Sequence, residues 1–284
     1  MAWNIEGRTV LITGGNSGIG KETARALAAR GADVVLTARN PEVGRSVAAE
    51  LGSAGGGSVR AMQLDLADAV STASFAGRFL DETGDLGVLI NNAGVMLGSR
   101  ATSPDGHEMT FLVNHLGHFQ LTCLLGERLT ASAPARVITV ASSAHYRADD
   151  IELEAPPGRF RGFRTYSRSK LANVLFAKEL ARRLDGTGVR SYAVHPGLVS
   201  TRLAQDGDSR VSGMLWKLLS PRMLTPAEGA ATTVYAVTDP ALNDHTGAYL
   251  SDERIRTPSD RSRDEALAQR LWAFSEEATG CALP

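Results

Sequence analysis

Short apolar runs alternate with helical patterns along most of the chain. Thr9–Thr13 is a short buried run, the glycine loop Gly14–Gly20 follows it, and the next residues place small or apolar side chains on one helical face. Gly31 supplies a left-handed stop to that helix, and Asp33–Thr37 is predicted as the second strand. A strand, a helix and a strand in this order predict a right-handed crossover between parallel strands.

The same alternation continues toward the C-terminus. Further strands are predicted over 59–64, 86–90, 136–141, 190–195 and 246–250, with helices near 69–82, 106–129 and 165–184. The strands are rich in Val and Ile and show little polar alternation, which indicates burial on both faces. The sequence therefore predicts an α/β fold of the Rossmann type, a doubly wound, mostly parallel sheet of about seven strands with helices on both faces. Residues 1–284 are expected to form one domain.

Two segments interrupt the pattern, at 146–163 and 202–224. Apolar residues with helical spacing lie in the second, at the strand ends where α/β proteins bind ligands, so we expect 202–224 to be a substrate lid. The alternative is that these residues complete the core. Residues 252–284 are expected to be a C-terminal extension.

Composition excludes several classes of function. The formal net charge is −1 and 21% of the residues are charged, so no basic surface is available for nucleic acid or for an anionic membrane. Cys123 and Cys281 show no paired spacing, which argues against a disulfide framework and favours a reducing, cytoplasmic setting. No run approaches the ~18 apolar residues that a membrane span needs. The histidines show no metal-ligand spacing, and we expect no metal.

A dinucleotide site is predicted at the glycine loop. Gly14, Gly18 and Gly20 follow a buried strand and open a helix, so backbone N–H groups at the helix N-terminus can face a pyrophosphate. The first glycine allows the tight turn, the second the close approach of phosphate, and the third close packing of the helix on the sheet.

The end of the second strand bears on the choice of cofactor. An NAD enzyme usually has Asp or Glu there, and this chain has Arg39, which can bind a 2′-phosphate through charge-assisted hydrogen bonds. The sequence therefore predicts NADP(H). Asp65 follows the third strand and could accept a hydrogen bond from the adenine amino group, or instead cap the next helix.

Three further motifs, together with the glycine loop, carry a family resemblance. They are Asn91-Asn-Ala-Gly94, Ser142-Ser143 and Tyr166-Ser-Arg-Ser-Lys170, each after a predicted strand or on a predicted helix. In order and spacing the chain resembles the short-chain dehydrogenase/reductases over residues 7–251. The stretches 113–119, 166–173 and 271–280 resemble the retinol-dehydrogenase-like branch of that superfamily.

A tyrosine and a lysine provide the candidate proton-transfer chemistry. Tyr166 and Lys170 are four residues apart on a predicted helix and share a face. A tyrosine with a pKa near 10 transfers protons poorly at neutral pH, and a nearby ammonium favours the phenolate. We therefore expect Lys170, together with the oxidised nicotinamide, to lower the pKa of Tyr166.

The resemblance implies two further catalytic residues. Ser143 would orient the substrate oxygen toward Tyr166, with Ser142 as its neighbour and rival, and Asn114 would hold a water that links Lys170 to solvent. Ser143 and Tyr166 are 23 positions apart, a longer gap than the family's usual dozen or so. The extra residues raise His145 and Tyr146 as possible substrate-side polar groups, with ordinary loop residues as the alternative.

The predicted site consists of catalytic residues and residues that bind the cofactor. The predicted catalytic residues are Asn114, Ser143, Tyr166 and Lys170. The residues predicted to bind NADP(H) are Gly14, Asn16, Ser17, Gly18, Ile19, Gly20, Arg39, Asp65, Leu66, Asn92, Ala93, Gly94, Tyr166, Lys170, Pro196, Gly197, Val199 and Thr201. His195, before the Pro-Gly turn, is read as structural.

Hydride transfer between NADP(H) and a carbonyl or alcohol carbon of a hydrophobic small molecule is the predicted function. A C=C reductase similar to protochlorophyllide reductases, and a dinucleotide-sensing protein without turnover, are the alternatives. The resemblance also implies a homo-oligomer, a dimer or a tetramer, formed through the helices at 106–129 and 165–184.

Overall fold

A single mixed sheet organises the chain. The computed structural model describes residues 3–53, 55–151, 160–199 and 223–284. Its strands are β1 (Thr9–Ile12), β2 (Asp33–Ala38), β3 (Val59–Gln63), β4 (Val88–Asn91), β5 (Ala135–Val140), β6 (Val189–His195), β7 (Tyr249–Ser251) and β8 (Arg254–Arg256). Their order in the sheet is β3-β2-β1-β4-β5-β6-β7-β8, and every pair is parallel except β7 with β8. The doubly wound, mostly parallel sheet is therefore confirmed, with eight strands where about seven were expected.

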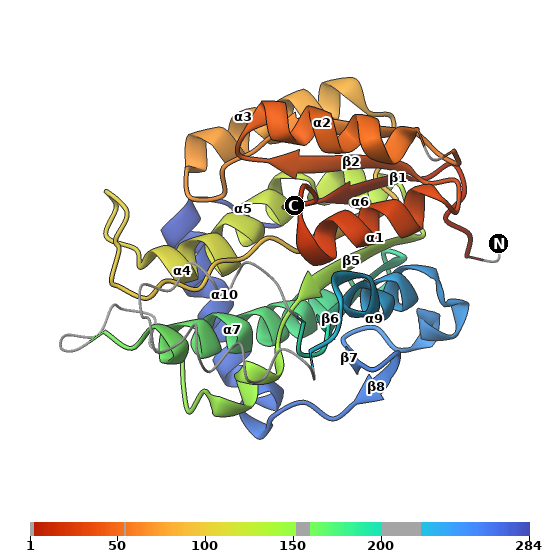
Figure 1. The fold of residues 1–284 in the computed structure, drawn as a ribbon. Coiled ribbons are helices and arrows are strands. Elements are labelled where there is room, and N and C mark those ends of the chain that lie inside the picture. The colour runs from red at the N-terminus through yellow and green to blue at the C-terminus, as the bar shows by residue number, and fades with distance from the viewer. Residues whose placement is uncertain (1–2, 54, 152–159, 200–222) are drawn as a thin grey trace.

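Helices lie on both sides of the sheet (Figure 1). They are α1 (Gly18–Ala28), α2 (Pro41–Gly52), α3 (Ala69–Glu82), α4 (Met109–Phe111), α5 (Gly117–Leu124), α6 (Gly126–Ala131), α7 (Gly162–Arg183), α9 (Pro226–Thr238) and α10 (Glu265–Thr279). Short helical turns add η1 (Leu112–Leu116), η2 (Ser143–Arg147), η5 (Pro240–Asp244) and η6 (Asp260–Arg263). Among the described residues, no helix combines the length and the apolar character that crossing a membrane requires.

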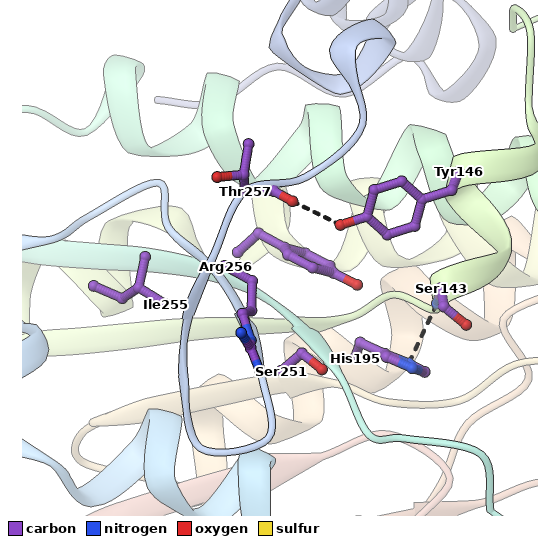
Figure 2. A pocket seen from close by; sticks show the side chains of 8 residues that line it. Ser143, Tyr146, His195, Ser251, Ile255, Arg256 and Thr257 are labelled. Atoms are coloured by element: carbon purple, nitrogen blue, oxygen red, sulfur yellow. Dashed lines mark hydrogen bonds between the residues drawn. The ribbon is translucent and has the colours of Figure 1, made fainter.

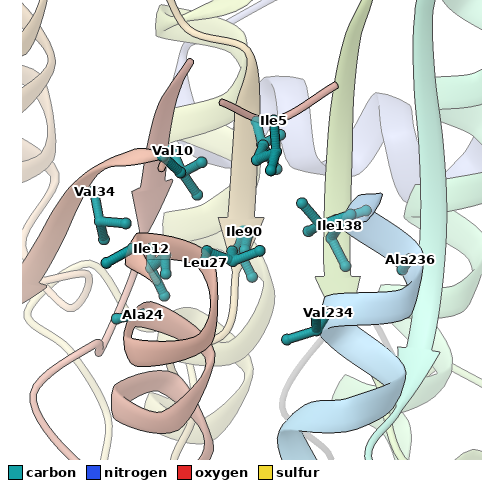
Figure 3. Close-up of a cluster of buried hydrophobic side chains, with 14 of the residues drawn as sticks. Ile5, Val10, Ile12, Ala24, Leu27, Val34, Ile90, Ile138, Val234 and Ala236 are labelled. Atoms are coloured by element: carbon teal, nitrogen blue, oxygen red, sulfur yellow. The ribbon is translucent and has the colours of Figure 1, made fainter. Parts of the chain in front are cut away.

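Alternate side chains of the strands fill two separate cores, one on each face of the sheet. Val10 and Ile12 of β1 pack with α1, α2 and α9 in the cluster of Figure 3. Leu11, between them, packs on the opposite face with α3, α5 and α7. Burial on both faces explains why these strands are apolar throughout, as the sequence indicated.

The helix predicted over 106–129 is not continuous. Its described form is α4, a π-helical turn at η1, then α5 and α6. Gly117, at the start of α5, lies against the segment that follows β3. A Cβ on Gly117 would be 2.4 Å from the carbonyl oxygen of Leu66. Single π-helical turns inside helices are frequent at functional sites, and η1 contains Asn114.

The C-terminal helix α10 covers α5 and α7. Trp272 of α10 is 1% exposed, and its ring lies 4.9 Å from that of Phe119 and 5.8 Å from that of Phe176, measured between centroids. The two helices expected to form a subunit interface thus pack against α10 of the same chain. Homo-oligomer formation through these helices stays a prediction.

Candidate active site

The glycine loop is held open at the N-terminus of α1. Gly14 and Gly18 have φ values of +63° and +54°, which glycine adopts without strain. Ser17, at the N-cap of α1, makes no side-chain hydrogen bond to the helix, whereas Asn40 and Asp68 cap α2 and α3. The first N–H groups of α1 therefore lack a side-chain acceptor, and they fit the phosphates of a dinucleotide.

The segment after β4 fastens this loop. Asn92 Nδ2 donates to the carbonyl oxygen of Thr13 at 2.7 Å. A Cβ on Gly20 would lie 2.5 Å from Asn92 Nδ2 and 2.5 Å from the Gly14 carbonyl oxygen, so only glycine fits there. The structure thus brings Asn92 and its neighbour Ala93 to the glycine loop, as the sequence predicted, although they lie about 80 residues apart in the chain.

Arg39 and Asp65 follow β2 and β3 at the same edge of the sheet. Arg39 is exposed, and no ion pair is recorded for it among the described residues, so its guanidinium is free to meet a ligand. The suggestion that Asp65 caps the next helix is wrong, because Asp68 Oδ1 accepts the N–H groups of Val70 and Ser71. Asp65 Oδ1 accepts instead from the N–H of Ala67, at 3.0 Å.

Tyr166 and Lys170 share a face of α7. Lys170 Nζ lies 5.6 Å from the centre of the Tyr166 ring and donates to the carbonyl oxygen of Val140, at the end of β5, at 2.9 Å. Burial raises the pKa of Tyr166 to about 12 and lowers the pKa of Lys170 to about 8. The lowering of the pKa of Tyr166 by Lys170 together with the oxidised nicotinamide stays a prediction, since burial is the largest influence on the pKa of both groups.

Ser142, and not Ser143, meets Tyr166. The Tyr166 hydroxyl has a side-chain hydrogen bond with Ser142, and this bond partly offsets the effect of burial on its pKa. Ser143 is exposed and begins η2, and its N–H donates to His195 Nδ1 at 3.2 Å. The structure therefore favours Ser142, the rival that the sequence left open, over Ser143 as the partner of Tyr166.

Asn114 lies in η1 and joins three segments. Its Oδ1 accepts from the N–H of Val95 at 2.7 Å, and its Nδ2 donates to the Val95 carbonyl oxygen at 3.0 Å and to Ser169 Oγ at 2.9 Å. A Cβ on Gly94 would lie 3.3 Å from Asn114 Oδ1 and 3.6 Å from Lys170 Nζ. Asn114 thus lies near Lys170, as predicted, but both of its amide hydrogens are already engaged.

A cavity of about 570 Å³ opens beside the serines (Figure 2). Its lining residues are Ser143, Tyr146, His195, Tyr249, Ser251, Ile255, Arg256 and Thr257. His195 was read as structural, yet it lines this cavity. Because its Nδ1 accepts from Ser143 and burial lowers its pKa to about 4, the neutral ring carries its proton on Nε2.

His145 does not line the cavity. It is fully buried, its Nδ1 donates to the Ser142 carbonyl oxygen at 2.7 Å, and its Nε2 accepts the N–H of Ser259 at 3.1 Å. Tyr146 does line the cavity, and its hydroxyl donates to the Thr257 carbonyl oxygen at 2.6 Å. His145 therefore holds the Ser142 backbone to the C-terminal extension, a contact over more than 110 residues that spacing alone could not reveal.

The turn after β6 lies at the same edge. Gly197 has a φ of +85°, and Val199 pairs with Leu224 in an isolated parallel bridge. Thr201, predicted to contact the nicotinamide, lies outside the described residues. The same holds for the predicted lid at 202–224, apart from Met223 and Leu224.

The fold and this site together define a doubly wound protein that binds a dinucleotide at the carboxyl edge of its sheet. Residues 8–211 match the profile of the family described as short chain dehydrogenase. The chain belongs to this family of oxidoreductases, which use nicotinamide cofactors, and within it to the retinol-dehydrogenase-like branch. The family membership expected from the motifs is confirmed.

Similar proteins support this placement. The chain is 46% identical to retinol dehydrogenase 12 of Homo sapiens, over 97% of this chain and 87% of that protein. It is 43% identical to retinol dehydrogenase 11 of Mus musculus, with the same coverage. A crystal structure of an uncharacterised protein from Mycobacterium Paratuberculosis has a TM-score of 0.80 and 36% identity, and covers 100% of both chains. A complex of Pseudomonas aeruginosa RhlG with NADP has a TM-score of 0.69 and 26% identity, covering 87% of this chain and 95% of that one.

Proposed function

We propose that this chain transfers a hydride between the nicotinamide ring of NADP(H) and a carbonyl or alcohol carbon, with Tyr166 as the acid or base. The observation that carries the proposal is the contact of Tyr166 with Ser142, beside Lys170, with the adjacent residue Ser143 lining an open cavity. A protein that only senses a dinucleotide has no need of a tyrosine hydroxyl in contact with a serine hydroxyl and next to a buried lysine.

The proposed chemistry needs one proton donor and one orienting group. When bound, the reduced nicotinamide supplies the hydride that reaches the substrate carbon. Tyr166 donates its phenolic proton to the substrate oxygen as the negative charge develops, and Ser142 donates a hydrogen bond that aims that oxygen. Lys170 then returns a proton toward the tyrosinate, and its lowered pKa of about 8 suits proton exchange near neutral pH. Oxidation of an alcohol follows the same steps in reverse.

Arg39 supports the preference for NADP(H). It is exposed at the end of β2, and the position carries no carboxylate to repel a 2′-phosphate. Two similar solved structures, with 26% and 29% identity, are described as holding NADP.

The substrate is proposed to be a largely hydrophobic small molecule. Tyr146, Tyr249 and Ile255 supply apolar surface to the cavity, and the relatives named above are retinol dehydrogenases. His195 and Arg256 add hydrogen-bond donors to the described walls, so an oxygen-bearing group on the substrate beyond the reacting carbon would find a partner.

The deciding experiment combines a substrate panel with one isosteric variant. The purified protein is assayed with NADPH against aldehydes and ketones, including retinal, and against enones for reduction of a C=C bond. Tyr166→Phe should abolish turnover and leave the Kd for NADPH within about twofold, because only the hydroxyl is removed. Binding without turnover of any carbonyl by the wild type would refute the proposal, and saturation of the C=C bond alone would identify the alternative reductase.

A further inference from the structure

One fully buried histidine is not used by the proposed chemistry, yet it contacts two parts of the site. His118 in α5 is 1% exposed. Its Nε2 lies 2.8 Å from the hydroxyl oxygen of Thr13, and its Nδ1 lies 3.2 Å from the carbonyl oxygen of Asn114. A buried imidazole with both nitrogens in contact acts as a rigid bridge of fixed length.

The direction of each hydrogen bond follows from its partners. Thr13 Oγ1 accepts the N–H groups of Asn92, at 2.9 Å, and of Ala93, at 3.0 Å, so both of its lone pairs are used. Its own proton therefore goes to His118 Nε2, which is closer than the Ile90 carbonyl oxygen at 3.3 Å. The Asn114 carbonyl can only accept, so His118 Nδ1 carries the ring proton. Burial lowers the pKa of His118 to about 4, which keeps this single tautomer at neutral pH.

The two partners belong to different functions of the site. Thr13 opens the glycine loop and holds the segment after β4 through its hydroxyl. Asn114 lies in the π-helical turn η1 and contacts Ser169, which precedes Lys170 in the chain. Gly94 lies close to both Asn114 and Lys170, because a Cβ on it would be 3.3 Å from Asn114 Oδ1 and 3.6 Å from Lys170 Nζ. His118 is the side chain that joins the dinucleotide loop directly to the turn that carries Asn114.

We propose that His118 is a positioning residue that sets the dinucleotide loop and the Asn114 turn at a fixed separation, so that the bound cofactor is aligned with the turn from which Asn114 is predicted to hold a water linking Lys170 to solvent. The expected effect of His118 on kcat rests on the proposed function. The expected effect of His118 on the Kd for the dinucleotide rests only on its contact with Thr13.

His115 provides a matched control. It lies in the same π-helical turn, is also 1% exposed, and its Nε2 contacts Ser275 Oγ of α10 at 2.9 Å. This contact stabilises the packing of α10, and the other side-chain partner of His115, Asn173, lies on α7, so neither partner belongs to the dinucleotide loop. A substitution there tests the cost of disturbing a buried histidine in η1 without breaking the proposed bridge.

Two variants of His118 separate its contact with Thr13 from its contact with Asn114. In His118→Asn the amide sits where Nδ1 was and keeps the bond to Asn114, whereas in His118→Gln the amide reaches the position of Nε2 and keeps the bond to Thr13. We expect His118→Asn to raise the Kd for the dinucleotide about fivefold, the equivalent of one hydrogen bond of ~1 kcal/mol, with kcat at saturating cofactor near that of the wild type. His118→Gln should lower kcat with little change in Kd, and His115→Gln should change neither.

A double-mutant cycle tests the Thr13 arm without turnover. Thr13→Val removes the hydroxyl, so His118→Asn should cost no further dinucleotide affinity in that background. An equal loss of affinity in both backgrounds, or parallel changes of Kd and kcat in both His118 variants, would overturn the proposal.

If the His118 variants do not unfold cooperatively, the Thr13→Ser and Thr13→Val variants replace them in the test. Thr13→Ser should keep the wild-type Kd and Thr13→Val should not. If the wild type binds dinucleotide but reduces no substrate, the proposed function has failed. The Kd values of the variants then still test the contact between His118 and Thr13.

Discussion

Lys170→Met is expected to stabilise the protein without dinucleotide near neutral pH while it abolishes turnover. Lys170 is 3% exposed, and its ammonium donates to the Val140 carbonyl oxygen at 2.9 Å. Among the described residues no carboxylate pairs with it, and burial lowers its pKa from 10.5 to about 8. A buried cation without a paired anion is costly, and methionine fills a similar volume without a charge.

The size of the effect follows from the pKa. The interval between 10.5 and about 8 corresponds to ~3 kcal/mol, at ~1.4 kcal/mol per pKa unit. The lost hydrogen bond to Val140 offsets ~1 kcal/mol of this gain. The Val140 carbonyl keeps the bond from Asn173 Nδ2 at 3.1 Å, so no buried acceptor is left unpaired. The net expectation is ~2 kcal/mol in favour of the variant.

The sign of the pH dependence is fixed by which state holds the proton. The pKa of Lys170 is lower in the folded protein, so its cost is complete below pH 8, where both states are protonated. The cost falls as the pH rises from about 8, because the folded protein now holds the neutral amine, and it disappears above about 10.5. The advantage of Lys170→Met should therefore be largest at pH 7 and smaller at pH 10.

Urea unfolding without dinucleotide, at pH 7 and at pH 10, measures this difference. Lys178→Met is the matched control, because Lys178 lies on the same helix and is only partly buried. A variant less stable than the wild type at pH 7, or an advantage that does not change with pH, would refute the reasoning.

Three further predictions concern the site and the C-terminal helix. Ser142→Ala should lower kcat about 100-fold, by loss of an orienting donor, while Ser143→Ala stays within about threefold; steady-state kinetics would contradict the structure if the order were reversed. Arg39→Asp should raise KM for NADPH and improve the use of NADH, and an unchanged ratio of kcat/KM for the two would remove the basis for NADP(H). Trp272→Ala should cost ~3–5 kcal/mol of unfolding free energy, because the side chain is 1% exposed between two aromatic rings. A loss below ~1 kcal/mol would show that α10 does not depend on this contact.

Local patterns were enough for much of the fold. The succession of β1 to β7 along the chain follows from short apolar runs between turn residues, and the loop at Gly14 follows from glycine's tolerance of a positive φ. Tyr166 and Lys170 are four residues apart on one helix, so their shared face is fixed by helical geometry alone. β8 was not predicted because its three residues are exposed and contain a single apolar side chain between two arginines, which forms no apolar run.

The serine could not be chosen from the sequence. Ser142 and Ser143 are adjacent and chemically identical, and the direction of each depends on how η2 leaves β5. That direction is set by distant contacts, since His145 binds the Ser142 carbonyl on one side and Ser259 on the other. A pattern within one element cannot encode a contact made between two ends of the chain.

The sequence by itself determined the doubly wound sheet, the open glycine loop and the tyrosine–lysine face, because each depends on residues within one strand, turn or helix. Only the tertiary structure decided that Ser142 meets Tyr166, that α10 covers α5 and α7, and that His118 links Thr13 to Asn114. Thr13 and His118 are 105 residues apart, and they are in contact only because α5 packs on the face of the sheet near the end of β1.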